Sequence, residues 1–242
     1  MVTDTSAHPR RPAVGVEVAR EIFERVPSYS RNVLACTMTT PIDLAPVRQM
    51  LTAECRRLSG VDVSGMDTVR DWRAAFKQVG IATRKFRPSP ESLLRRVARE
   101  EDVETGHPLV DLGTLISIRY GIPVGMHVIP PAVDALELRF ARDTDVFETF
   151  AGVLERPEPG EVVYAGEERV LTRRWVWRQG AYGSITNVPP WDLAINIDSL
   201  DDTVGSHAVD TLTELIADLT GTTISGHALL TNDVRHAELT CS

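Results

Sequence analysis

Arginines and tryptophans are interleaved in one short run whose side chains could bind an anion beside an aromatic group. The run is Arg173-Arg-Trp-Val-Trp-Arg-Gln-Gly, and it contains two of the four tryptophans of the chain. Read as a β-strand, it presents Arg174 and Arg178 on one face and both tryptophans with a glutamine on the other. Arginines that share a face can converge on one anion, and the opposite face can line an aromatic cavity. The residues of this run that we expect to bind a substrate are Arg174, Trp175, Trp177, Arg178 and Gln179. The alternative is a core strand whose arginines pair with carboxylates.

Positive charge is concentrated in a second region. Residues 70–99 contain nine arginines and lysines but only two acidic residues, although the whole chain has a net charge of −8. Arginine and lysine bind phosphate well, and the aromatic residues Trp72 and Phe86 lie among them. The segment therefore predicts a local positive surface. The alternative is that these charges belong to the solvated outer faces of helices.

Common catalytic and cofactor motifs are missing from the sequence. It contains no GxxxxGK[ST], GxGxxG, GxSxG, CxxC or HExxH pattern. The six histidines do not have the spacing of metal ligands. We therefore expect neither a metal nor a cofactor.

Composition narrows the class of protein. The 242 residues are 43% hydrophobic and 25% charged, as in globular proteins with a substantial core. No apolar run approaches the roughly 20 residues that span a bilayer, and the first residues lack the apolar segment of a secretory signal. Cys36, Cys55 and Cys241 are too few and too scattered for a disulfide framework. We expect a cytoplasmic protein that binds neither membranes nor DNA, since the negative net charge argues against a wholly basic surface.

Periodicity and turn residues predict the elements that must position these side chains. Steps of three and four between apolar residues predict helices, and β-branched runs between Pro and Gly predict strands. The predicted helices are 44–58, 69–79, one beginning near 89, 108–120 and 207–219. The predicted strands are 31–39, 135–140, 161–165, 170–177, 193–197 and 224–230. Because helices come mostly early and strands mostly late, we expect an α+β fold: a single domain with a mixed or antiparallel sheet and several helices packed on it. Residues 1–13 are predicted to be a flexible tail and 14–236 the domain.

Six segments in a fixed order resemble a known module. They are Asp71-Trp-Arg-Ala-Ala-Phe-Lys-Gln-Val-Gly, Lys85-Phe-Arg-Pro-Ser-Pro-Glu-Ser-Leu-Leu-Arg-Arg, Pro108-Leu-Val-Asp-Leu, Gly121-Ile-Pro-Val-Gly, Pro159-Gly-Glu-Val-Val-Tyr and Arg173-Arg-Trp-Val-Trp-Arg-Gln. The series resembles freestanding relatives of the tRNA-binding and editing module, called B-three/B-four, of the phenylalanyl-tRNA synthetase beta subunit. The resemblance covers residues 71–198.

The resemblance implies a function in translation fidelity. In the synthetase, the pocket of this module hydrolyses tRNA that carries a wrong amino acid, so a freestanding copy is expected to act in trans on the tRNA acceptor end. An aminoacyl ester is already activated, and its hydrolysis needs mainly a positioned water and hydrogen-bond donors for the oxyanion. The resemblance adds Thr114 and Asn196 to the substrate-binding residues. The residues expected to contact tRNA are Arg73, Lys77, Arg84, Lys85 and Arg87.

The sequence departs from the synthetase pattern at the pocket. Gly113 and Thr114 stand where the synthetase module has a Thr-Asn pair. Gly125 stands where that module has its pocket histidine. His127 comes two residues later, where its side chain could point elsewhere. Asn196 is the best match to the pocket glutamate, with Asp198 the nearest carboxylate. Specificity is therefore expected to come from the Arg174–Gln179 run.

Two other functions remain open at this level. Loss of the histidine and glutamate equivalents favours a non-catalytic binding module for an aminoacyl-tRNA end or a free amino acid. A protein that docks on an aminoacyl-tRNA synthetase is the third reading.

Overall fold

The computed structural model describes residues 13–241. The predicted tail, residues 1–13, therefore lies outside the described residues except for its last member. The larger of two sheets has the strand order β12-β1-β4-β7-β8-β5-β6, with β9 paired to β8. It is mixed, because β1 runs parallel to β4 and β5 parallel to β8. Its strands are β1 (Val14–Val18), β4 (Ala135–Phe140), β5 (Val146–Glu148), β6 (Leu154–Glu155), β7 (Val162–Gly166), β8 (Arg169–Arg173), β9 (Arg178–Gln179) and β12 (His236–Leu239).

The smaller sheet is antiparallel and has the order β11-β2-β10-β3. Two nine-residue strands form its centre, and their residues are buried on both faces. The strands are β2 (Ser30–Met38), β3 (Val124–Val128), β10 (Trp191–Ser199) and β11 (Gly226–Leu230). Side chains of β2 and β10 alternate between two separate apolar clusters, which is why these strands read as nearly continuous hydrophobic runs.

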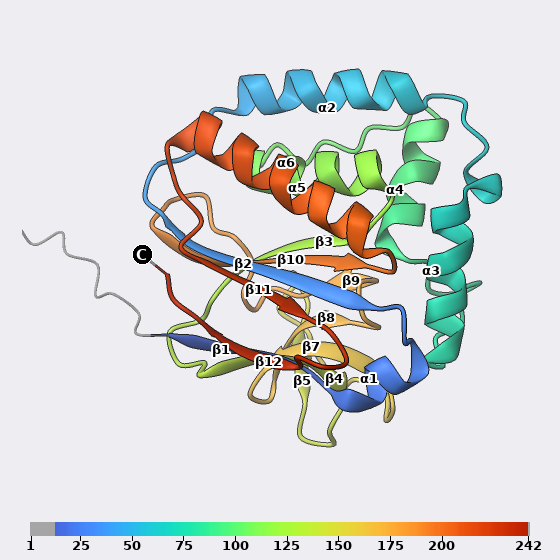
Figure 1. The fold of residues 1–242 in the computed structure, drawn as a ribbon, viewed down its shortest axis with the longest axis vertical. Coiled ribbons are helices and arrows are strands. Elements are labelled where there is room, and N and C mark those ends of the chain that lie inside the picture. Colours follow the sequence, from blue (N-terminus) through green and yellow to red (C-terminus); the bar gives the residue numbers. More distant parts are fainter. Residues whose placement is uncertain (1–12, 242) are drawn as a thin grey trace, which may run out of the picture.

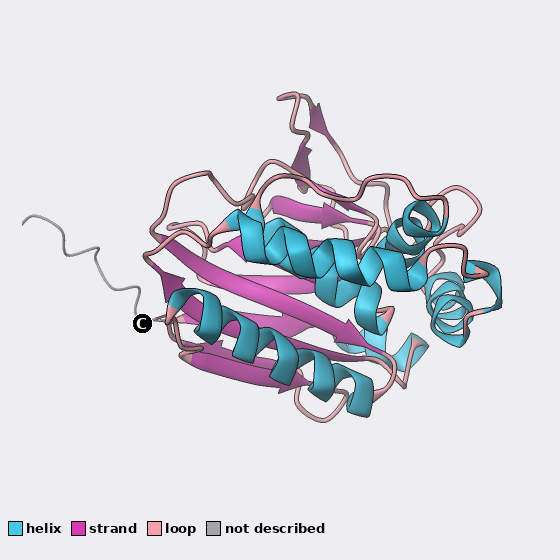
Figure 2. Cartoon of the chain, turned by 90° about the horizontal axis from the view of Figure 1, so that it is seen from above, coloured by secondary structure: helices cyan, strands magenta, loops and turns pink. Residues whose placement is uncertain are grey.

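Helices cover the outer face of the smaller sheet, so the molecule has three layers (Figures 1 and 2). The first cluster lies between these helices and the sheet, and the second lies between the two sheets. Helix α3 closes the second cluster from the side with Trp72 and Phe76. The helices are α1 (Arg20–Arg25), α2 (Leu44–Leu58), α3 (Asp67–Gln78), α4 (Ser89–Ala98), α5 (Pro108–Tyr120) and α6 (Asp202–Thr220). The α+β prediction is confirmed, with helices packed on a sheet. Among the described residues, no helix is both long enough and apolar enough to span a membrane.

Local signals place several helix ends where the sequence predicts them. The carboxylate of Asp43 accepts a hydrogen bond from the backbone N–H of Ala45 and caps α2. Gly121 ends α5 with φ of 68°, a conformation that glycine adopts without steric cost. Helix α4 begins at Ser89, as predicted, and Pro88 occupies the cap position without a side-chain capping bond.

The predicted strand 170–177 is wrong beyond Arg173. Strand β8 ends there, and the chain turns through Arg174 and Trp175, whose φ angles are 46° and 64°. The hydroxyl of Thr172 donates to the carbonyl of Trp175 at 2.8 Å, and β9 then pairs back on β8. The run is therefore a hairpin, and strict alternation of faces does not apply to it. Residue-type patterns did not reveal this turn because it contains neither glycine nor proline.

Burial of one tryptophan accounts for that turn. Trp175 is fully buried in the cluster between the sheets. Its ring meets Tyr29 and Trp72 edge-on, with centroids 4.9 and 5.6 Å away, and stacks on Phe76 at 5.8 Å. Burying so large a ring offsets the cost, of order 1–3 kcal/mol, of a left-handed backbone at a non-glycine residue.

Candidate functional site

A cavity of about 150 Å³ lies between the two sheets, close to the Arg178–Gln179 strand. The smaller sheet contributes residues from β2, β3 and β10, and the larger sheet contributes residues from β7, β8 and β9. Strand register brings the polar residues of the smaller sheet together: Asp198 pairs with Arg31, and Asn196 pairs with Gly125. Directly paired residues and residues two apart share a face of a sheet, so these side chains all face the larger sheet.

A buried ion pair forms one wall of the cavity. The Arg31 and Asp198 side chains are 3% and 1% exposed, and two hydrogen bonds of 2.7 and 3.0 Å join the guanidinium to the carboxylate. The Tyr29 hydroxyl donates to the same carboxylate at 2.8 Å. The guanidinium also lies over the ring of Tyr164, 4.7 Å from its centroid. Nη1 of Arg31 has no hydrogen-bond partner among the described residues.

Two further buried polar groups line the cavity beside this pair. Neither amide atom of Asn196 nor the Tyr164 hydroxyl makes a hydrogen bond of ordinary geometry among residues 13–241, although the Asn196 amide lies close enough to the hydroxyl to lower its pKa. Burial raises the pKa of Tyr164 to about 12, although Arg31 and Asn196 act to lower it, so the phenol keeps its proton at neutral pH. An unpaired buried polar group costs about 1–3 kcal/mol, and several such groups around one cavity point to a polar ligand.

His127 lies at the same cavity and does not point elsewhere. It is two residues from Gly125 on β3, so both residues face the larger sheet. A Cβ atom on Gly125 would lie only 3.0 Å from Nε2 of His127, so the glycine leaves room for this ring. Nδ1 lies 3.5 Å from the side-chain nitrogen of Gln179. Burial, with the charge of Arg31, lowers the pKa of His127 to about 3, so the imidazole is neutral at physiological pH.

The structure divides the residues predicted from the Arg174–Gln179 run. Trp177, Arg178 and Gln179 line the cavity, whereas Arg174 and Trp175 do not. Trp175 is in the core. Arg174 is buried beside the ring of Phe86, 3.8 Å from its centroid, and forms ion pairs with Glu158 and Glu161 at 3.0 and 3.3 Å. The alternative reading, arginines paired with carboxylates, therefore describes Arg174.

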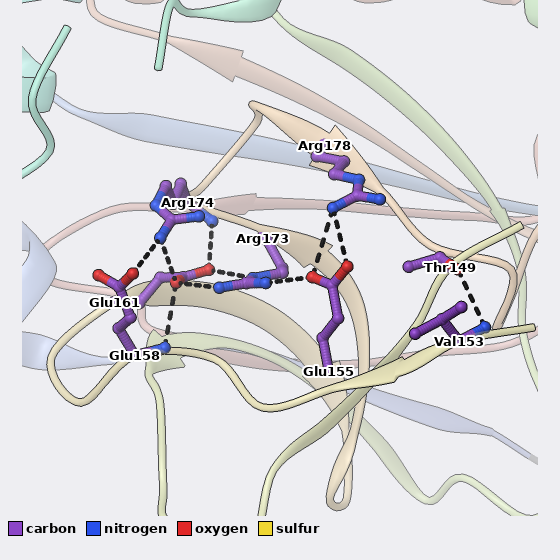
Figure 3. A network of polar contacts seen from close by, with 8 residues as sticks. All are labelled: Thr149, Val153, Glu155, Glu158, Glu161, Arg173, Arg174 and Arg178. Carbon is purple, nitrogen blue, oxygen red and sulfur yellow. Dashed lines mark hydrogen bonds and ion pairs between the residues drawn. The ribbon is translucent and has the colours of Figure 1, made fainter. Parts of the chain in front are cut away.

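A chain of ion pairs lies beside the cavity and reaches its lining at Arg178 (Figure 3). Glu161 accepts two hydrogen bonds from Arg173, at 2.8 and 2.9 Å. Arg173 also donates to Glu155 at 2.5 Å, and Arg178 approaches both oxygens of Glu155 at 3.3 Å. These last contacts are long, and the Arg178 side chain is 40% exposed, so it is the least constrained arginine of the three.

A second cavity of about 460 Å³ adjoins the first. Gln179 and Val124 line both cavities and form a wall that the two share. Thr114, which the sequence assigns to the substrate, lines the second cavity from α5, whereas Asn196 lines the first.

Residues 70–99 present a mixed surface. Glu91 is fully buried, and its carboxylate binds Arg73 at 2.5 and 2.8 Å and Arg95 at 2.8 Å, with Arg87 at 3.7 Å. Burial acts to raise the pKa of Glu91, but the bonds from Arg73 and Arg95 outweigh it and lower this pKa. Lys77, Arg84 and Lys85 are exposed. Of the five residues predicted to contact tRNA, Arg73 is therefore engaged internally.

Reasoning from the sequence missed several cavity residues: Arg31, His127, Tyr164 and Thr172. A signal was present for one pair. Arg31 and Asp198 are charged residues within two largely buried strands, and buried charges need partners of opposite sign. Nothing in the sequence places β2 next to β10, so the pairing itself needed the fold.

These observations define an α+β protein with a small polar cavity between a mixed and an antiparallel sheet. Residues 71–188 match the family model of the B3/4 domain. The matched segment contains Gly125, His127 and the Trp177–Gln179 side of the cavity, whereas Arg31 and Asn196 lie outside it.

One solved structure with a similar arrangement is an N-terminal fragment of the phenylalanyl-tRNA synthetase beta subunit from Pyrococcus horikoshii. The TM-score is 0.45 and the sequence identity 10%, over 93% of this chain. This chain spans 54% of that structure's chain. No curated protein sequence matches this one significantly.

Proposed function

We propose that this protein binds the aminoacyl end of tRNA and hydrolyses the ester between the amino acid and the terminal ribose. The match to the B3/4 domain supports a role related to tRNA binding or editing. The observation that carries the proposal is the grouping of unpartnered polar groups from Arg31, Tyr164 and Asn196 around one cavity. A volume of about 150 Å³ suits a group of a few heavy atoms, such as an aminoacyl moiety.

Hydrolysis of an aminoacyl ester needs stabilisation of one developing charge. Water adds to the acyl carbon, the carbonyl oxygen becomes an oxyanion, and the acyl C–O bond to ribose then breaks. The products are the free amino acid and the ribose hydroxyl of tRNA. Arg31 Nη1, the Asn196 amide and the protonated Tyr164 are donors of the type that stabilises such an oxyanion. In a protected site, fixed donors of this kind contribute more than they do in water.

Exposed cations outside the cavity suit the phosphates of the acceptor end. Lys77, Arg84 and Lys85 are exposed and are not among the arginines that pair with Glu91, and Phe86, next to Lys85, contacts Trp177 of the cavity lining. The rings of Phe86 and Trp177 meet edge-on, with centroids 4.7 Å apart. A small positive surface next to two aromatic rings can hold a single-stranded end despite the net charge of −8.

The test is deacylation of a panel of aminoacyl-tRNAs, followed as loss of labelled amino acid from tRNA. Wild type should deacylate at least one of them faster than buffer does. Asn196→Ala should reduce that rate, whereas Asn232→Ala, which removes an exposed amide from the turn between β11 and β12, should not. No deacylation by wild type, while a known editing enzyme works on the same substrates, would refute the proposal.

A second candidate is binding without hydrolysis, and the state of the acid–base groups favours it. His127, with a pKa of about 3, is a weak base, and the Asp198 carboxylate already accepts bonds from Arg31 and Tyr29. Under this proposal, a free amino acid or an aminoacyl-tRNA raises the melting temperature, Arg178→Ala abolishes the shift, and no ester is cleaved.

A further inference from the structure

A third cavity, of about 360 Å³, lies in the helical layer, between α2 and the end of α4 with the segment that follows it (Figure 1). Its lining residues differ from those of the two cavities described above. Its volume falls in the range of pockets that hold small organic ligands. Leu51, Val97 and Val103 supply an apolar part of the lining and belong to the core cluster beneath the helices. A hydrocarbon group can therefore bury its surface against them.

Acidic side chains outnumber basic ones in the lining of this cavity. Four of the lining residues are acidic, and one, Arg56, is basic. Glu104 is paired with Arg48 at 2.7 Å. Glu101 is paired with Arg99 at 3.4 Å. The remaining two carboxylates therefore decide which charge a ligand of this cavity can carry.

Glu100 and Asp102 are these two residues, and their charges are not neutralised. One oxygen of Glu100 accepts a hydrogen bond from the Ser59 hydroxyl at 2.8 Å. One oxygen of Asp102 accepts from the backbone N–H of Glu104 at 2.8 Å. Both residues are exposed, and neither forms an ion pair within residues 13–241. Each carboxylate thus keeps an oxygen that can accept from a cation.

Cys55 reports the sign of the field in the cavity. It lines the cavity from α2 and is partly exposed. Burial raises the pKa of its thiol, and the charges of Glu104, Glu54 and Asp102 raise this pKa further. A negative field at this wall disfavours an anion and favours a cation.

An uncommon backbone conformation holds one of the free carboxylates in place. Glu100 follows the last turn of α4 with φ of 59°, a left-handed conformation that glycine usually supplies at this position. Its own N–H bonds to the carbonyl of Val97 at 2.9 Å, as at many helix ends. That closure needs no side chain, and any side chain here costs stability. Local structure gives no reason for a glutamate at residue 100, whereas a cation site does.

We propose that this third cavity binds a small aliphatic amine, whose hydrocarbon body contacts Leu51 and Val97 and whose ammonium group donates to Glu100 and Asp102. Burial of the aliphatic body provides affinity, and the two carboxylates select the positive charge. The site shares no lining residue with the polar cavity, so it does not depend on the proposed hydrolysis.

The first experiment compares hexylamine with hexanol, which has the same hydrocarbon body and no charge, by calorimetry on the full chain at pH 7. Hexylamine should bind roughly tenfold more tightly, the low end for hydrogen bonds to charged groups, because both carboxylates are exposed. Equal affinities, or no binding of hexylamine, would overturn the proposal.

Glu100→Gly separates a binding role from a structural one. It should raise the melting temperature, because glycine adopts this φ without steric cost, and yet weaken hexylamine binding roughly fivefold, the upper value for one exposed ion pair. Glu167→Gly is the matched control, because Glu167 is also an exposed glutamate with positive φ, 54°, and lies outside this cavity. It should leave hexylamine binding unchanged. Unchanged binding in Glu100→Gly, or an equal loss in both variants, would show that Glu100 does not hold the amine.

Cys55 locates the charge preference independently of ligand affinity, since the other two cysteines are buried. Its thiolate attacks 2-aminoethyl methanethiosulfonate, which is cationic, or the 2-sulfonatoethyl reagent, which is anionic; a disulfide forms and methanesulfinate leaves. Both reactions need the thiolate, so the raised pKa cancels in the ratio of the two rates. That ratio should exceed the ratio for free 2-mercaptoethanol and should fall in Glu100→Gly but not in Glu167→Gly. A ratio equal to that of the free thiol would show that the cavity does not select cations and would overturn the proposal.

Discussion

The neutral, buried His127 makes acid stability a direct test of the cavity's electrostatics. The ring is 2% exposed, and its pKa falls from an ordinary 6.5 to about 3 because burial and the Arg31 charge both disfavour the imidazolium. Between these two values the unfolded chain binds a proton that the folded chain does not bind. Stability from this group is therefore complete above about pH 6.5 and falls as the pH drops toward 3.

The magnitude follows from the two pKa values. Lowering the pH from 7 to 5 protonates His127 in the unfolded state almost fully and in the folded state hardly at all. Linkage then predicts a loss of about 2 kcal/mol in the free energy of unfolding from this histidine alone. His127→Gln has no such titration, so its stability should fall by about 2 kcal/mol less over the same interval.

The assay is urea denaturation of both proteins at pH 7 and pH 5. Comparing the two pH-dependent losses cancels every other titrating group that the proteins share. Equal losses for wild type and His127→Gln would show that the folded protein accommodates a charged imidazole, and the electrostatic account of the cavity would be wrong.

Three further predictions concern the core, the cavity wall and the basic surface. Asp198→Ala leaves the Arg31 guanidinium buried without its carboxylate and should cost about 3–5 kcal/mol by urea denaturation; a loss below about 1 kcal/mol would contradict the buried pair. Trp175→Ala should cost about 3–5 kcal/mol, whereas Trp177→Ala should cost about 1 kcal/mol and impair ligand binding instead; the reverse order in a thermal melt would contradict their placement. Lys85→Ala should weaken tRNA binding and reduce the dependence of log Kd on log salt by about one, with free amino acid binding unchanged; equal losses for both ligands would show that Lys85 does not contact phosphate.

Local chemistry predicted much of the secondary structure. The helix 44–58 has the predicted bounds, and strand 135–140 also agrees at both ends. These elements are recognisable because their apolar period and their terminal residues act over a few positions. Strands β1, β3 and β12 were not predicted, since each gains its stability from pairing with strands distant in sequence.

The candidate site was predictable only in part, for a similar reason. Three of the five residues predicted from the run beginning at Arg173 line the cavity, because an unusual cluster of arginine and tryptophan is visible without a fold. Trp175, however, was predicted to bind substrate and is a core residue. A sequence pattern shows which types of side chain are present. The turn at Arg174 and Trp175 breaks the strand alternation, so the alternation does not predict the direction of the side chains in this run.

The amino-acid sequence by itself determined the α+β class, the principal helices and the positive segment, because hydrophobic period, capping and charge are properties of neighbouring residues. The tertiary structure alone decided which polar groups meet. Arg31 and Asp198 are 167 residues apart along the chain, yet the register of β2 against β10 makes them direct partners. A polar cavity between two sheets depends on such long-range pairing, which no local pattern contains.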